Sequence, residues 1–127
     1  MIISTPVSLG ELVDKLSILH IKNINIKDNE KLKLIREEFD LLNKTLNNHI
    51  KRDDIQKYLD SLIEINSKLW VIEDDIRDCE RNKNFDQKFI DLARSVYFTN
   101  DQRSEVKLDI NKKFGSTIIE VKSYEEY

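Results

Sequence analysis

Apolar residues recur at intervals of three and four along most of this 127-residue chain, which is the spacing of one face of an α-helix. The longest such run lies at about residues 54–82, where apolar positions alternate steps of four and three without a break. These positions are Tyr58, Leu62, Ile65, Leu69, Ile72, Ile76 and Cys79. We therefore expect one long helix with a continuous apolar seam.

Four shorter helices are expected beside this long one. The same periodicity places them at about residues 8–24, 30–50, 86–98 and 102–114. Residue types that cap helices flank the periodic segments: Ser8, Asp28, Asp53 or Asp54, Asp86 and Asp101 at the N-terminal ends, and Gly115 at the last C-terminal end. Ser8 and Glu11 also have the spacing of a capping box.

The last residues, "STIIEVKSYEEY", alternate weakly and predict an extended tail, and a small ribbon with "MIIST" is an alternative. Two glycines and one proline are too few for the turns of a sandwich or barrel. We expect residues 1–127 to form a single all-α domain. The predicted architecture is an antiparallel helical bundle of about five helices, with one long central helix and a short extended C-terminal tail.

Charge and composition exclude several classes of protein. The formal net charge is −3 with both signs interspersed, which disfavours duplex nucleic acid as a partner. No stretch approaches 18 apolar residues and the N-terminus has no signal-peptide pattern, so we expect no membrane span and a cytoplasmic location. His20 and His49 are isolated, and we expect neither a metal nor a cofactor.

A polar stripe follows the seam of the long helix, one residue further along. Its members are Asn66, Trp70, Glu73, Arg77 and Glu80, and they again step by four and three. At 100° per residue this stripe lies at the edge of the core. Asp74, Asp75 and Asp78 fall on other faces, where we expect solvent.

Basic residues beside the apolar stripes of several helices have two interpretations. The residues are Lys15, Lys22, Arg77, Arg94 and Arg103. In the first interpretation, these residues form structural ion pairs between helices, because an unpaired buried charge costs several kcal/mol. Alternatively, they converge on a pocket for an anion such as a phosphate or a carboxylate, which the fork of an arginine fits.

Catalytic patterns are weaker. The sequence has no glycine-rich phosphate loop and no nucleophile with a matching base, so we expect a binding protein rather than an enzyme. A helical enzyme of the chorismate mutase kind is an alternative that would use Lys15, Lys22, Lys31 and Arg36, although the arginine that such enzymes carry early in the first helix is absent. A structural interaction protein is another alternative, with a homodimer formed through the third helix.

Four long segments carry a resemblance to a known family. They are "VSLGELVDKLSILHIK", "LWVIEDDIR", "FIDLARSVYFTNDQR" and "INKKFGSTIIEVKSY". In this order they resemble an uncharacterised family of small bacterial and phage proteins, domain of unknown function 6165. The resemblance implies no reaction. Members are often encoded near glycosyltransferases, which suggests a link to cell-surface polysaccharide biosynthesis.

The resemblance also implies a set of polar positions. They match Glu11, Lys15, Lys22, Asp28, Lys31, Arg36, Trp70, Glu73, Arg77, Arg94, Tyr97, Asn100, Asp101, Arg103, Lys122 and Tyr124. Together with the basic residues beside the apolar stripes, these positions lead us to expect a ligand site. Its members are Lys15, Lys22, Trp70, Glu73, Arg77, Arg94, Tyr97, Asn100 and Arg103. The expected ligand is a small anionic molecule, for example a nucleotide or sugar phosphate, or else a partner protein. For a phage member of this family we expect a location in the host cytoplasm, and sequestration of a host signalling nucleotide is the phage form of the ligand hypothesis.

Overall fold

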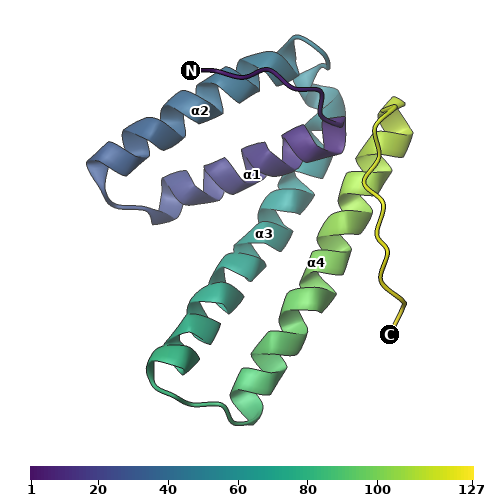
Figure 1. The fold of residues 1–127 in the computed structure, drawn as a ribbon. Coiled ribbons are helices and arrows are strands. Elements are labelled where there is room, and N and C mark those ends of the chain that lie inside the picture. The colour runs from purple at the N-terminus through teal and green to yellow at the C-terminus, as the bar shows by residue number, and fades with distance from the viewer.

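The protein is composed of four α-helices and no strand, as a computed structural model of all 127 residues shows. The helices are α1 (Leu9–Asn25), α2 (Asn29–Asn47), α3 (Arg52–Arg81) and α4 (Gln87–Phe114). The α1–α2 pair lies across one half of the α3–α4 pair, and the other half of α3–α4 extends beyond it (Figure 1). The all-α class is confirmed, but the predicted number of five helices is wrong.

The predicted fourth and fifth helices are one continuous helix, α4. The break expected at Asp101 does not occur, because this residue makes contacts far along the chain instead of capping a helix. Its carboxylate accepts hydrogen bonds from the hydroxyls of Tyr124 and Tyr127. Thr99, two residues before Asp101, is buried. Tertiary contacts therefore override the local preference of these residues for a helix end.

Most of the predicted caps are confirmed, namely Ser8, Asp28 and Asp86 at N-termini and Gly115, in the left-handed conformation with φ 69°, after α4. The cap predicted at Asp53 or Asp54 is wrong. Lys51 precedes α3 without a side-chain cap, and both aspartates lie within the first turn. Negative charge in a first turn still favours the helix, because it faces the positive end of the helix dipole.

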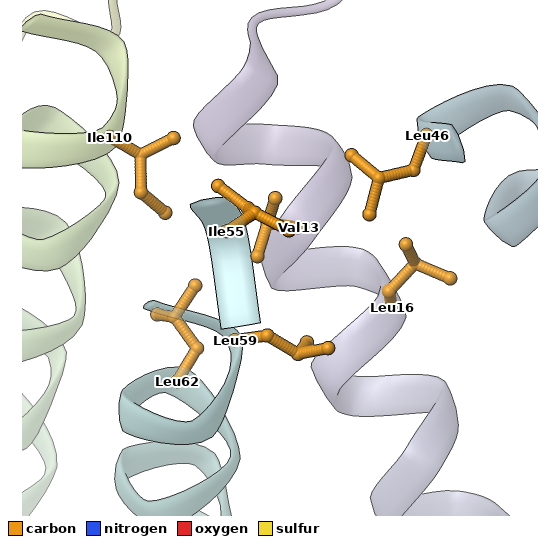
Figure 2. Close-up of a cluster of buried hydrophobic side chains, with 7 residues drawn as sticks. All are labelled: Val13, Leu16, Leu46, Ile55, Leu59, Leu62 and Ile110. Carbon is orange, nitrogen blue, oxygen red and sulfur yellow. The ribbon is translucent and has the colours of Figure 1, made fainter. Parts of the chain in front are cut away.

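Both α1 and α3 contact all three other helices: α1 packs against α2, α3 and α4, while α3 packs against α1 and α4 and donates a hydrogen bond from Arg52 to Asn43 of α2. The main core is a cluster of seven buried side chains contributed by all four helices (Figure 2). Its members are Val13, Leu16, Leu46, Ile55, Leu59, Leu62 and Ile110. Since α2 packs against α1, the core lies around α1 and at the adjoining half of the α3–α4 pair.

The start of α1 lies directly against the end of α4. The first backbone N–H groups of a helix have no partner inside it. Here the N–H of Leu9 donates to Ser116 Oγ at 3.2 Å, and that of Gly10 donates to Asn111 Oδ1 at 2.8 Å. A Cβ atom added at Gly10 would lie 2.5 Å from the backbone oxygen of Lys107. Only glycine permits this approach, which fixes the N-terminus of α1 on α4.

Residues 116–127 run back along α4 and form neither a helix nor a strand, so they make no ribbon with residues 1–5 (Figure 1). Aromatic side chains attach the far end of this tail. The Tyr127 ring packs edge-on against Tyr97 and Phe98, with centroids 5.3 and 4.9 Å apart. The Tyr124 hydroxyl lies 2.9 Å from Asp101 Oδ1. The hydrogen bonds to Asp101 raise the pKa of Tyr124, and they raise the pKa of Tyr127 to about 12.

We predict that Gly10→Ala destabilises the protein, although alanine at an open helical position would stabilise it by about 1 kcal/mol. The added methyl group has to push α1 away from α4, and overpacking of this kind costs about 1–3 kcal/mol. Urea unfolding measures the difference. His20→Ala, at an exposed position of the same helix, is the control. A Gly10→Ala protein as stable as wild type would show that the close approach is not required.

A second prediction concerns the tyrosines of the tail. Because a protonated hydroxyl donates to Asp101 and a phenolate is repelled by it, docking is complete below the ordinary tyrosine pKa of about 10. It is lost as the pH rises through the raised pKa values, about 12 for Tyr127. Absorbance titration should show two of the four tyrosines ionising late. Asp101→Asn should bring both back toward the ordinary value, and Asp109→Asn, an exposed carboxylate of α4, should not. Uniform ionisation in wild type would contradict this docking.

Candidate functional site

A buried carboxylate joins three helices at the centre of the molecule. Asp14 of α1 is 1% exposed. Its Oδ1 accepts a hydrogen bond from Asn66 Nδ2 of α3 at 2.9 Å, and the same amide nitrogen lies 2.7 Å from Ser17 Oγ. Arg103 of α4 donates through Nε to Oδ1 at 2.9 Å and through Nη2 to Oδ2 at 2.5 Å. The carboxylate thus has a bidentate cationic partner and an amide donor.

Arg103 is placed to donate hydrogen bonds to another acceptor in addition to Asp14. A guanidinium carries five N–H donors, and the two bonds to Asp14 leave three of them for other acceptors. Its side chain is 27% exposed, so part of the group reaches solvent. The hydrogen bonds to Asp14 raise the pKa of Arg103 further above its ordinary value, so the charge persists at every physiological pH.

One open face of Arg103 lies in a cavity of about 420 Å³ formed by α1, α3 and α4. We call it the Trp70 groove. Its lining comprises Ile18, Ile21, Asn66, Leu69, Trp70, Glu73, Asp74, Arg77, Asn100 and Arg103. The Arg77 guanidinium is 3.2 Å from the Glu73 carboxylate within α3, and this pair is largely exposed. The groove therefore combines an indole and aliphatic side chains with two arginines, one firmly held and one on the surface, and with the carboxylates of Glu73 and Asp74.

A second cavity, of about 680 Å³, lies on the other side of Asn100 and Arg103, between α4 and residues 116–127. We call it the tail cavity. Its charged lining consists of Arg103, Lys107 and Lys122, with Glu11, Asp101, Glu120 and Glu125. Tyr97, Tyr124 and Tyr127 supply aromatic surface. Asn100 and Arg103 line both cavities, which adjoin at these two residues.

Lys107 is the buried cation of the tail cavity, with 8% of the residue exposed. Its Nζ lies 2.9 Å from Glu11 Oε2 and 3.0 Å from Glu120 Oε2. Burial alone would lower the pKa of this ammonium, but the hydrogen bonds to both carboxylates outweigh that and raise it. Hydrogen bonds from Lys122, at 2.6 Å, and from Lys107 lower the pKa of Glu120. Lys107 and Glu120 are therefore both charged near neutral pH.

The residues expected from the sequence to bind a ligand are divided by the structure. Trp70, Glu73, Arg77, Asn100 and Arg103 line the Trp70 groove, and Tyr97 lines the tail cavity. Lys15, Lys22 and Arg94 line neither cavity. Lys15 is 3.8 Å from Glu38 of α2, and Arg94 lies over the Phe98 ring, 5.9 Å from its centroid. Of the five basic residues beside the apolar stripes, only Arg77 and Arg103 line the same cavity.

Sequence reasoning missed Asp14 and Glu120 as members of the site. A signal for Asp14 was present, because Gly10, Asp14, Ser17 and Ile21 step by four, three and four beside the leucine stripe, and all four are buried. Small and polar residues at that spacing mark a face in close contact with other helices. No comparable signal marks Glu120, because its partner Lys107 lies in another element and nothing local in the tail specifies the contact.

No group of three or more histidine, cysteine or acidic side chains is placed to hold a metal ion. None of the four helices has the length and apolar character needed to cross a membrane. The chemistry available in the two cavities is thus that of fixed cations, carboxylates, amides and aromatic rings.

Comparison with known proteins gives one match. No curated protein and no solved structure matches the chain. The match is to the model of a family described as "Family of unknown function (DUF6165)", and it covers residues 3–127. It includes Asp14 and Arg103, both cavities and the tail. The chain therefore belongs to the family of domain of unknown function 6165.

Proposed function

We propose that this protein binds a small anionic molecule, bearing a phosphate or carboxylate group, against Arg103 in the Trp70 groove. The observation that carries the proposal is the arrangement of Arg103. Asp14 holds the guanidinium by two hydrogen bonds, which leave other donors free, and Arg103 lines a cavity on each side. A cation whose orientation is fixed by a buried carboxylate loses little conformational freedom when it binds, which favours affinity.

The rest of the groove indicates the kind of ligand. Arg77 is paired only with Glu73 on the surface, and exposed pairs of this sort contribute little to stability. It is free to turn toward an anion held by Arg103. Trp70, Leu69 and Ile18 offer apolar area beside these charges. A ligand with a compact anionic group and a flatter, less polar part fits this combination. Nucleotides and sugar phosphates, which would suit a role in surface polysaccharide biosynthesis, are members of that class.

The alternative of a chorismate-mutase-like enzyme gains no support from the geometry. Lys15, Lys22, Lys31 and Arg36 line neither cavity, and Arg36 donates instead to the side chain of Asn23 at 3.0 Å. A homodimer through α3 stays a prediction. The half-buried seam and the exposed Val71 of α3 are compatible with it.

The groove hypothesis predicts different effects for two arginines of α3. Arg77 and Arg81 are both 65% exposed and both paired with a carboxylate of their own helix, but only Arg77 lines the groove. Arg77→Gln should weaken binding of inorganic phosphate about tenfold, because a charge-assisted hydrogen bond contributes about 1.5–3 kcal/mol. Arg81→Gln should leave it unchanged. Trp70, the only tryptophan, reports binding by fluorescence. Equal effects of the two variants would contradict a site in the groove.

A second prediction separates binding by Arg103 from its structural role. A neutral residue in place of Arg103 would leave the buried Asp14 carboxylate without its cationic partner, which costs about 3–5 kcal/mol and threatens the fold. Arg103→Lys keeps a cation for Asp14 but loses the planar fork. We expect this variant to retain the helical circular dichroism spectrum and to bind phosphate at least about tenfold more weakly, since the lost hydrogen bonds are charge-assisted. A folded Arg103→Lys protein with wild-type affinity for phosphate would show that the Asp14–Arg103 pair has only a structural role.

A further inference from the structure

The tail is held against α4 by side chains. Its only hydrogen bond between backbone groups is at its start, where the N–H of Ser116 donates to the Asn111 carbonyl at 2.9 Å. Residues 117–127 make none. Their polar anchors are the ion pairs of Glu120 and the tyrosine hydroxyls on Asp101. A segment attached in this way can be displaced in part without breaking any helix.

The carboxylate of Glu120 is bound as a ligand anion would be. Oε2 is 3.0 Å from Lys107 Nζ, and Oε1 is 2.6 Å from Lys122 Nζ. A buried ammonium needs a partner. If Glu120 leaves, Lys107 still has Glu11 at 2.9 Å. Another anion can therefore replace Glu120 without any step in which Lys107 is buried and unpaired.

The charge of the tail cavity makes this replacement necessary for an anion to enter. With the tail in place, three cations face four carboxylates, and the cavity has no positive excess to attract a free anion. Each cation already has a carboxylate partner: Asp14 for Arg103, Glu11 and Glu120 for Lys107, and Glu120 for Lys122. Displacing Glu120 removes one negative charge and frees donors on two lysines.

Arg103 and Lys107 are one helical turn apart on α4, and both line the tail cavity. Side chains at positions i and i+4 are neighbours on a helix, with Cβ atoms about 5–6 Å apart. This spacing suits two anionic groups joined through one bridging atom better than it suits a single phosphate. One group meets the open donors of Arg103, and the second reaches Lys107, where Glu120 now lies.

We propose that Lys107 and Lys122 form a second anion position, that Glu120 occupies it in the free protein, and that the ligand carries two linked anionic groups, as a diphosphate does. The first group binds Arg103, and the second displaces Glu120 and loosens the tail. This inference rests on the proposed function and specifies its ligand class. The tail is thereby an internal competitor, which lowers the affinity for ligands too short to displace it.

The test is titration of the full-length protein with inorganic pyrophosphate by isothermal calorimetry. Glu120→Gln removes the competing charge and should tighten pyrophosphate binding about tenfold, because the competent state no longer has to be populated against the ion pair. Glu125→Gln removes the same charge from the same tail and cavity at a residue that makes no ion pair. It should change the affinity by less than about twofold, as expected of an exposed charge. The gain should vanish in Glu120→Gln combined with Lys107→Gln.

Each outcome distinguishes the two proposals. If Glu120→Gln and Glu125→Gln have the same effect, the second anion position is wrong, while weaker phosphate binding in Arg77→Gln than in Arg81→Gln would still support the Trp70 groove. A gain in Glu120→Gln that survives in the double variant would also contradict the role of Lys107. If wild type and Glu120→Gln bind neither phosphate nor pyrophosphate, both proposals fail.

Discussion

The arrangement of the helices in this protein depends on one interaction, the pairing of the buried Asp14 carboxylate with side chains of two other helices. A charged group that is 1% exposed must be paired, and the partners come from two other helices: Asn66 from α3 and Arg103 from α4. These bonds set the rotation of both helices about α1. The close approach at Gly10 sets the distance between α1 and α4. For this reason the short α1 contacts all the other helices, although α3 and α4 are much longer.

The same interaction creates the candidate site, because α1 is shorter than its neighbours. Along α3, the side chains facing α1 are Ile55, Leu59 and Leu62, followed by Asn66 at Asp14. Near the end of α1 the same stripe continues as Trp70, Glu73 and Arg77, with Ile18 and Ile21 beside it. A face that would need apolar residues under a longer α1 is free to be polar. The position of the groove thus follows from helix length.

Local sequence patterns predicted what depends on local spacing. The ranges of α1, α2 and α3, most of the caps and the polar stripe of α3 follow from periodicity and capping chemistry, and the structure contains them. The error at Asp101 has the opposite cause. Its side chain is used by tyrosines more than 20 residues away, and nothing local distinguishes such a residue from a helix cap. The spacing of Gly10, Asp14, Ser17 and Ile21 indicates a contact face on α1 but not its partners, so Asp14 was overlooked because Arg103 and Asn66 lie on other helices. How α1 crosses α4 decides which charges meet, and periodicity within one helix carries no information about that crossing.

The central claim is that Arg103 has a fixed orientation and donors left to bind an anion. The most direct measurement is the NMR spectrum of the arginine side-chain N–H groups during addition of inorganic phosphate. The account predicts that the Nε–H signal of Arg103 is protected from exchange before phosphate is added, because it is bonded to Asp14. Its Nη signals should then shift saturably together with those of Arg77, while the signals of Arg81 stay in place. Arg103 signals that exchange freely, or that do not respond to phosphate while the protein stays folded, would contradict the account.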